Sequence, residues 1–261
     1  MFHIQIFIEY FKQYLKTRLE YRGDFFAQFA TDLLFQGVNL VFILVVFSHT
    51  TNLHGWSREE VIFIYGYFLV PYAIFSTFFN LWDFNERYII KGELDRVLTR
   101  PVHSLVQVIM ETMTPESLLG VVTGLAVMGW SMSQMDYVWT MMDVVFFFLF
   151  VVGGVAIYGG IYIALTSISL FSDSKTDIQP IMYNIGNYGR YPVNLYSRII
   201  QFVLTWILPF AFVGFYPASF LLGSSDWKTF AFLTPIVGGI YFTIGVMIWN
   251  WGIRHYRGAG N

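Results

Sequence analysis

Long apolar runs alternate with shorter polar segments along the whole chain. A helix that crosses the hydrocarbon core of a bilayer needs about 20 mostly apolar residues. Several runs approach or exceed this length, and they predict an all-α membrane protein with six transmembrane helices. The predicted spans are residues 26–47, 61–82, 106–130, 139–170, 199–214 and 230–251.

A further helix is predicted before the first span. Apolar and charged side chains there fall on opposite faces of a helical period, which is typical of a helix lying in a membrane interface, over residues 1–24. A helix docked on the rest of its own protein has the same pattern, and both interpretations stay open. The apolar face consists of Ile4, Phe7, Ile8, Phe11, Tyr14 and Leu15, and the charged face of Glu9, Lys12, Lys16 and Glu20.

Basic residues are distributed unevenly over the two sides of this arrangement. All of the 15 Lys and Arg except Arg58 and Lys228 fall on one side. Because loops rich in Lys and Arg stay in the cytoplasm, we expect both termini and two long loops on the cytoplasmic side of the inner membrane. The chain is then one domain, residues 1–261, with helix pairs at 25–82 and 106–171, cytoplasmic loops at 83–105 and 172–198, a last pair at 199–252 and a tail at 253–261.

Composition supports a membrane location and narrows the chemistry. The chain is 56% hydrophobic and 20% aromatic, so a soluble domain of this size would expose far too much apolar surface. A net charge of −2 argues against a nucleic-acid partner, because such a partner requires a basic surface that displaces counterions from phosphates. The sequence contains no cysteine, which excludes disulfides, thiolate metal ligands and cysteine nucleophiles.

Motifs of ATP hydrolysis and of metal catalysis are missing from the sequence. No GxxxxGK[ST] phosphate loop and no HExxH motif occurs, and the five histidines are scattered over termini and loops. A pair of acids, Glu59 and Glu60, resembles the pair of intramembrane proteases, but Ile64 stands where they need an arginine. We therefore predict that the pair caps a helix that begins after Ser57, and we expect no catalytic or metal site.

The loop between the second and third predicted spans contains a short helix. Gly92 can end the preceding helix in a left-handed conformation and Pro101 stops whatever precedes it, which isolates residues 93–99. Acidic residues occupy the first turn, where the helix dipole favours negative charge. One face is apolar, and an apolar face on a helix held below the membrane predicts contact with a partner. That face consists of Leu94, Val97 and Leu98.

Residues 214–228 interrupt the region between the fifth and sixth predicted spans. Pro217 and Gly223 bracket the apolar residues 218–222, which are too few to cross a bilayer. An ordinary exposed loop would be more polar. The pattern therefore predicts a pair of short helices that dip into the outer leaflet.

Polar side chains form a single stripe along the first predicted span. Such side chains are costly in hydrocarbon and usually face the bundle interior or a pathway. They either line a translocation path or bond to neighbouring helices or to a second subunit. The stripe consists of Gln28, Asp32, Gln36 and Asn39, at positions i, i+4, i+8 and i+11.

The third and fourth predicted spans carry acids and small residues. Glu111 and Glu116 flank Pro115, and the group forms either a kinked functional site or a solvated entrance near the cytoplasmic end. Small residues allow helices to approach closely, and we expect the glycines to mark helix contacts. They are Gly120 and Gly124 in a GxxxG pattern, followed by Gly153, Gly154, Gly159 and Gly160.

Residues 89–101 carry a signature that reads I-x-x-G-E-hydrophobic-D-x-x-L-x-R-P, and Tyr216 and Pro217 supply a later Tyr-Pro element. Together with the predicted arrangement of helices, this signature makes the chain similar to permease subunits of the type 2 ABC exporters. It resembles in particular a branch of uncharacterised permeases. The signature residues are Ile89, Gly92, Glu93, Leu94, Asp95, Leu98, Arg100 and Pro101.

The resemblance implies a set of partners. The short helix would be a coupling helix seated in a groove on a separate cytoplasmic ABC ATPase, with the amino-terminal helix beside it. Two permease chains, identical or homologous, would pair through spans one and five above two ATPase copies. ATP and Mg²⁺ would bind to the ATPases, so no cofactor is expected on this chain. The coupling residues would be Glu93, Leu94, Asp95, Arg96, Val97 and Leu98.

The implied function is the export of an unidentified hydrophobic or amphipathic substrate through a lipid membrane, driven by ATP hydrolysis in the partner. Spans one, two and five would flank the path. Two alternatives are a secondary transporter and a non-transporting membrane scaffold. A secondary transporter typically shows internal repeats, and no clear repeat relates the two halves. A scaffold would not need the short capped helix.

Overall fold

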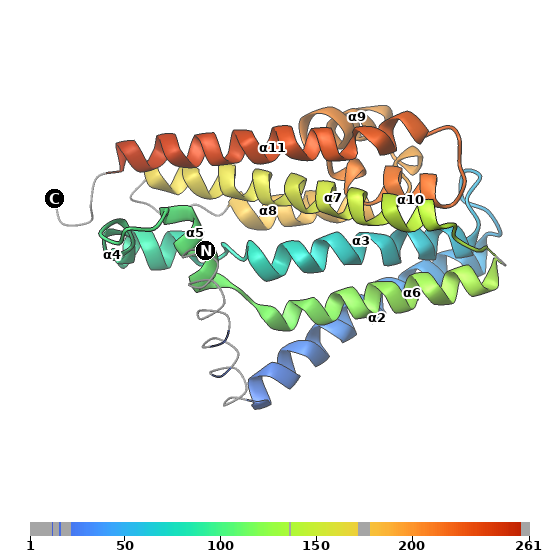
Figure 1. The fold of residues 1–261 in the computed structure, drawn as a ribbon. Coiled ribbons are helices and arrows are strands. Elements are labelled where there is room, and N and C mark those ends of the chain that lie inside the picture. The colour runs from blue at the N-terminus through green and yellow to red at the C-terminus, as the bar shows by residue number, and fades with distance from the viewer. Residues whose placement is uncertain (1–11, 13–15, 17–21, 136, 172–177, 257–261) are drawn as a thin grey trace.

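The computed structural model describes residues 12, 16, 22–135, 137–171 and 178–256, and over these residues the fold is all-helical, as the sequence predicts (Figure 1). Four helices are long and apolar enough to cross a membrane, and two bent helix pairs raise the number of candidate spans to six. The predicted amino-terminal helix lies almost entirely outside the described residues. The four long helices are α2 (Arg22–His49), α3 (Arg58–Phe78), α7 (Met141–Ile168) and α11 (Lys228–His255).

Helix α3 is the central helix, and every residue from 61 to 71 is buried. It begins at a capping box: the Ser57 hydroxyl accepts a hydrogen bond from the Glu60 amide, and the Glu60 carboxylate accepts one from the Ser57 amide at 2.8 Å. The structure confirms that the acidic pair starts a helix. Helix α2 is inclined to the bundle (Figure 1), and its side chains remain mostly exposed.

Helices α7 and α11 lie side by side (Figure 1), and glycines bring their backbones together. A Cβ on Gly160 would overlap the backbone of Tyr241, and a Cβ on Gly153 would lie 2.9 Å from the backbone nitrogen of Pro235. Gly124 makes the same close approach to α3, because its Cβ would lie 2.8 Å from the carbonyl oxygen of Gly66. These glycines therefore mark helix contacts, as predicted.

The third predicted span is wrong in its first part. Helix α5 (Ser104–Thr112) is separate and bends by 75° from the stretch Pro115–Gln134. That stretch consists of the 3-10 turn η2 (Pro115–Leu118) and α6 (Leu119–Gln134). Pro115 lacks the amide hydrogen that a continuous helix would need, so it begins a new helix instead. Thr114 fixes the corner to the end of α3, because its hydroxyl donates to the Ser76 carbonyl at 2.8 Å.

The second predicted span also ends earlier than expected. Helix α3 stops at Phe78, four residues before the predicted end at Trp82. A π-helical turn, η1 (Asn85–Ile90), follows it. The backbone amides of Lys91 and Gly92 close this turn by donating hydrogen bonds to the carbonyl oxygens of Glu86 and Ile89, respectively.

The fifth predicted span is wrong as a continuous helix. Helix α9 (Arg198–Phe202) and the π turn η6 (Val203–Ile207) bend by 77° into a second arm. The break precedes Pro209, which lacks an amide hydrogen, and so it comes before the predicted end at Gly214. The second arm consists of η7 (Phe210–Phe212) and α10 (Phe215–Leu221). Pro217 lies in the first turn of α10 without breaking it, and Gly223 follows its end with a φ of 81°.

Residues 178–195 run along α3 rather than forming a surface loop. The segment contains α8 (Ile178–Gly186) and the 3-10 turns η4 (Asn187–Arg190) and η5 (Val193–Leu195). Near its start, the Gln179 side chain donates to the Leu81 carbonyl at 2.9 Å, beyond the end of α3. Near its end, the side-chain oxygen of Asn194 accepts a hydrogen bond at 3.0 Å from the indole of Trp56, which precedes α3. The segment therefore passes α3 from one end to the other.

We expect Gly160→Ala to lower the stability of the protein by about 1–3 kcal/mol, because the added methyl group forces α7 and α11 apart. The thermal unfolding midpoint in detergent would measure this loss. Gly239→Ala on α11 is the matched control, since nothing lies within 4 Å of its added Cβ. Alanine there should leave the midpoint unchanged or raise it. Equal midpoints for the two variants would contradict the close contact.

Candidate functional site

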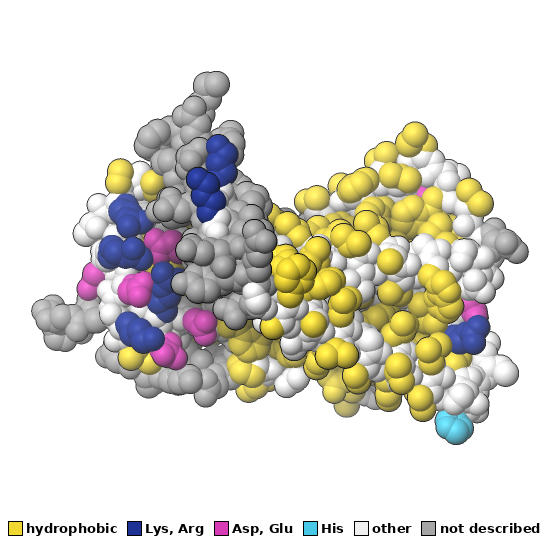
Figure 2. All heavy atoms as spheres, turned by 90° about the horizontal axis from the view of Figure 1, so that it is seen from below, with side chains coloured by type: hydrophobic (Ala, Val, Ile, Leu, Met, Phe, Trp, Pro, Cys, Tyr) yellow, Lys and Arg dark blue, Asp and Glu magenta, His cyan; other side chains and the backbone are white. Residues whose placement is uncertain are grey.

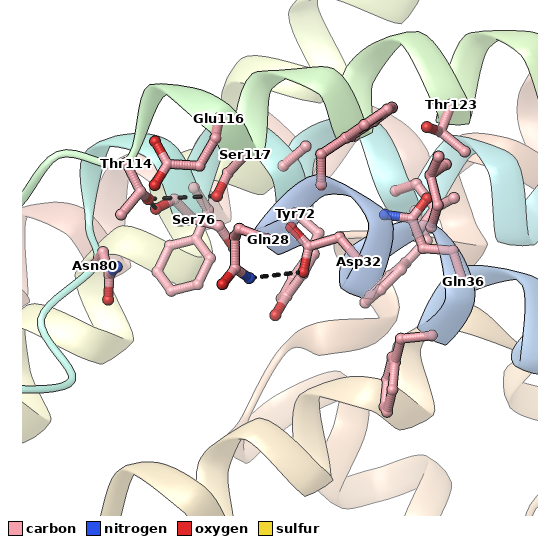
Figure 3. Close-up of a pocket in the computed structure, with 18 of the residues that line it drawn as sticks. Gln28, Asp32, Gln36, Tyr72, Ser76, Asn80, Thr114, Glu116, Ser117 and Thr123 are labelled. Atoms are coloured by element: carbon pink, nitrogen blue, oxygen red, sulfur yellow. Dashed lines mark hydrogen bonds between the residues drawn. The ribbon is translucent and has the colours of Figure 1, made fainter. Parts of the chain in front are cut away.

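A polar cavity of about 470 Å³ lies between α2, α3, the η2–α6 stretch and the 178–195 segment (Figure 3). Helix α2 contributes all four side chains of the predicted polar stripe, because their helical spacing directs them to one side. The opposite wall contains Glu116 and Ser117 from η2 and Tyr72 and Ser76 from α3. The stripe residues on the cavity wall are Gln28, Asp32, Gln36 and Asn39.

The acids of the cavity come from two different elements. Asp32 on α2 accepts a hydrogen bond from the Gln28 amide at 3.1 Å. Glu116 projects from η2, and its side chain is buried with a residue exposure of 5%. Both carboxylates line this cavity. Glu111, which the sequence places in one group with Glu116, lies elsewhere, because the bend at residues 113–114 separates the two acids.

Arg190 is the basic residue of the cavity wall, and it is only 7% exposed. Its guanidinium donates to the side-chain oxygen of Asn39 at 2.6 Å and to that of Asn187, and it lies 5.6 Å from the ring centre of Phe68. Sequence analysis assigned Arg190 to a cytoplasmic loop. The neighbouring aromatic residues were the available signal, because Tyr183, Tyr188 and Tyr191 give this stretch more rings than an exposed loop needs.

The short helix predicted between the second and third spans is present as α4 (Glu93–Leu98), and Gly92 before it has a left-handed φ of 72°. Its apolar face is directed mostly inward. Leu94 and Val97 are fully buried in a second hydrophobic core that also contains Trp249 of α11, whereas Leu98 is 40% exposed. Of the three apolar residues on this face, only Leu98 is therefore available to an external neighbour. The outward surface of α4 is instead mostly polar and includes Asp95, Arg96 and Thr99.

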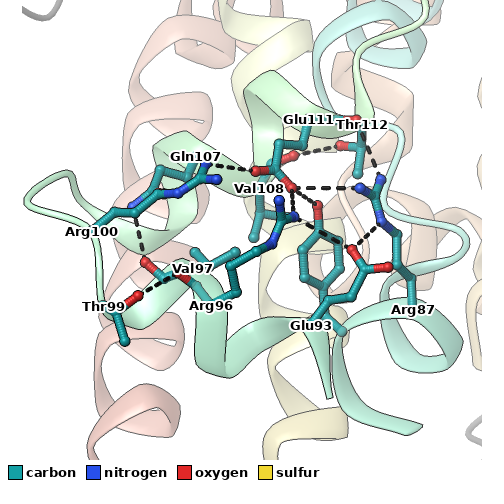
Figure 4. A network of polar contacts seen from close by, with 11 residues as sticks. Arg87, Glu93, Arg96, Val97, Thr99, Arg100, Gln107, Val108, Glu111 and Thr112 are labelled. Atoms are coloured by element: carbon teal, nitrogen blue, oxygen red, sulfur yellow. Dashed lines mark hydrogen bonds and ion pairs between the residues drawn. The ribbon is translucent and has the colours of Figure 1, made fainter. Parts of the chain in front are cut away.

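A network of charged side chains fixes α4 to α5, with the Glu111 carboxylate at its centre (Figure 4). One oxygen of this carboxylate lies 2.8 Å from Arg96 and 3.5 Å from Arg87, and the other lies 3.2 Å from Arg100. Glu93 also binds Arg87, at 2.9 Å. The Glu111 side chain is only 9% exposed, so solvent screens these contacts less than those of a surface pair.

Tyr88 completes the network. Its hydroxyl donates to the Glu111 carboxylate at 3.0 Å. Burial raises the pKa of Tyr88 above its ordinary value, and the neighbouring Glu111 charge raises it further. The hydroxyl therefore remains protonated and keeps donating to the carboxylate throughout the neutral range. Gln107 of α5 adds hydrogen bonds to the carbonyl oxygens of Val97 and Val102, at 3.1 and 2.7 Å.

Metal chemistry finds no support in the part of the chain that the structure describes. No group of three or more His, Asp and Glu side chains there is arranged to hold a metal ion. The features that can support a function are instead a polar cavity within an apolar bundle and a helix fixed at one end of that bundle.

A comparison with protein-family models matches residues 33–260 to the ABC-2 family transporter proteins. The chain belongs to this family. Comparisons with curated proteins and with solved structures find no match. As an ABC-2 family protein, the chain is a multi-pass membrane protein of a transporter. Such membrane subunits typically lack ATPase activity and act with an ATPase partner. Family membership thus favours an ATP-driven transporter over the secondary transporter and the scaffold.

We expect Glu111→Gln to loosen the attachment of α4 to α5, because three guanidinium groups lose their shared carboxylate. The loss of charged hydrogen bonds corresponds to about 1–3 kcal/mol for local opening, or roughly 5- to 150-fold faster trypsin cleavage after Arg96. Glu86→Gln is the control, since Glu86 pairs with Lys91 at the exposed surface. Cleavage at the rate of the unmodified protein would show that Glu111 does not fix α4.

Proposed function

We propose that the chain is the permease subunit of an ABC exporter and that α4 is the helix on which a separate ATPase acts. The observation that carries this proposal is the firm attachment of α4 at one end of the bundle, with an outward surface left exposed. A helix that transmits force has to be fixed to the element it moves. The buried Leu94 and Val97 and the Glu111 network meet this requirement.

The exposed surface near α4 suits a water-soluble partner. Figure 2 shows charged side chains gathered mainly at one end of this face of the molecule, whereas apolar side chains cover much of the rest. The ion pairs of residues 86–111 belong to that charged end. Leu98 adds an exposed apolar side chain, and an apolar anchor surrounded by charges is typical of the centre of a protein interface.

A continuous chain of contacts connects α4 with the cavity. Gln107 and Glu111 join α4 to α5, and α5 leads into the corner that Thr114 fixes to α3. Glu116 and Ser117, directly after that corner, line the cavity. A push on α4 would therefore displace the η2 wall of the cavity. This geometry supports a role for the polar stripe as part of the translocation path.

The contacts support a revised topology with six crossings. Residues 178–195 run the length of α3, which at 1.5 Å per residue is about 31 Å and matches a hydrocarbon core of about 30 Å. We assign this segment as the fifth crossing and the arms Arg198–Ile207 and Phe210–Leu221 as a re-entrant loop from the outer side. Both termini and α4 then remain cytoplasmic, but Ser197 and Arg198 move to the outer side.

Helix α2 supplies a surface for a second permease chain. Only 6% of its most apolar stretch is buried within the protein, although the length of the helix suits a span. Lipid alone can cover such a surface, but the polar stripe on the same helix borders it, and spans with polar sides favour a protein neighbour. We assign the pairing to this helix. Its most exposed apolar side chains are Phe26, Leu34 and Val38.

We expect Leu98→Asp to release the ATPase, because a charge replaces the exposed apolar side chain of α4. ATP hydrolysis that copurifies with the tagged chain in mild detergent should fall roughly tenfold. Val138→Asp is the matched control, since Val138 is an exposed apolar residue near the opposite end. Leu94→Asp is unsuitable, because Leu94 is fully buried.

The experiment separates two failures. If the unmodified chain brings no Mg²⁺-dependent ATP hydrolysis with it, the exporter assignment is wrong. If Leu98→Asp retains the activity as well as Val138→Asp does, the ATPase binds elsewhere on the chain.

Single cysteines test the topology, since the natural chain contains none. We expect Ser197→Cys to react with a membrane-impermeant maleimide in intact cells, because the revised fifth crossing places it outside. Asp95→Cys, on the exposed side of α4, should react only after the cells are permeabilised. Protection of Ser197→Cys in intact cells would restore the cytoplasmic position that the sequence predicts for residues 172–198.

A further inference from the structure

The cavity walls combine acids with an unusual number of aromatic rings. Nine of its 24 lining residues are Phe, Tyr or Trp. Figure 3 shows Asp32 and Tyr72 close together on one side of the space and Glu116 on another. Among the described residues that line the cavity, the two acids outnumber the one basic residue, Arg190, so these side chains carry net negative charge when ionised.

Arg190 lies at a distance from the acidic part of the cavity. It contacts Asn39, which is seven residues from Asp32 on the same helix, or about 10 Å along its axis. Its two terminal nitrogens donate to amide oxygens, and its Nε is buried away from open space. The guanidinium is therefore engaged by the protein, whereas the acidic part keeps the dominant charge.

A positive ligand would improve the electrostatics of the acidic part. Asp32 and Glu116 line the same cavity and carry charges of the same sign, and a cation between them would be attracted by both. Aromatic rings attract cations too, and Phe29, Tyr72 and Tyr183 are among the rings that line the cavity. The volume of about 470 Å³ falls within the range of small-molecule sites.

We propose that this cavity binds a lipophilic organic cation, a positively charged nitrogen or phosphorus centre that carries apolar groups. Asp32 and Glu116 provide the countercharge, and the aromatic walls hold the apolar groups. That such a cation is the exported substrate rests on the proposed function. The binding itself is a property of this chain and needs no ATPase.

Tetraphenylphosphonium and tetraphenylborate test the proposal, because the two ions share shape and size and differ in the sign of their charge. Equilibrium dialysis against the full chain in nanodiscs would measure binding, with empty nanodiscs as the baseline for partition into lipid. We expect saturable binding of the phosphonium alone. Asp32→Asn and Glu116→Gln should each weaken it about tenfold or more, since each removes a countercharge. Arg190→Gln removes the positive charge of the wall and should strengthen it.

Asp32→Glu keeps the charge and should retain most of the binding, which separates the loss of charge from a loss of folding. The thermal midpoint gives a second measurement, since a ligand that binds the folded chain raises it. Two outcomes would overturn the proposal: phosphonium uptake no greater than that of empty nanodiscs, or uptake insensitive to both carboxylate substitutions. Saturable borate binding that Arg190→Gln abolishes would assign the cavity to anions instead.

The two proposals fail separately. The dialysis uses the isolated chain, so a missing ATPase leaves it unaffected. Conversely, a chain that copurifies with an ATPase and binds no phosphonium would remain an exporter with another substrate.

Discussion

Backbone amide and carbonyl groups find no hydrogen-bond partners in hydrocarbon, and this constraint governs the arrangement of the whole chain. The long helices satisfy their own backbones and can face lipid. The irregular turns η4 and η7 cannot, and they lie inside the bundle against α3 and α7. Close backbone contact makes this possible: a Cβ on Gly214 would overlap the Gly189 carbonyl, and one on Gly189 would overlap that of Phe210. The cavity lies between η4, which contributes Arg190, and α2.

The lengths of apolar runs were enough to predict an all-helical membrane protein and four of its spans. Local chemistry predicted the Ser57 cap and the left-handed Gly92, because both depend on neighbouring residues only. Hydropathy could not show the bend before Pro209, since the residues around it are apolar on both sides. It also assigned residues 178–195 to a loop, because polar side chains such as Gln179 bind partners within the protein rather than water.

The candidate site shows the same division between local and distant information. Helical spacing grouped the stripe on α2 correctly, because a single helix fixes the relative positions of those side chains. The opposite wall combines Glu116 with Arg190, which are 74 positions apart, and no periodicity relates such residues. The sequence identified the apolar face of α4, but not the residues that this face packs against. The same three-residue pattern fits an external groove or, as for Leu94 and Val97, the protein's own core.

The burial of α3 limits which substitutions the sequence can accept during evolution. A helix with a side that faces lipid, such as α11, can exchange one aliphatic residue for another on that side, because acyl chains adapt to any shape. Helix α3 has no such side, since other parts of the protein surround it from Val61 to Pro71. Substitutions there must arise together with changes in several neighbours. As the sequence diverges, substitutions in α3 thus depend on substitutions in the helices that surround it.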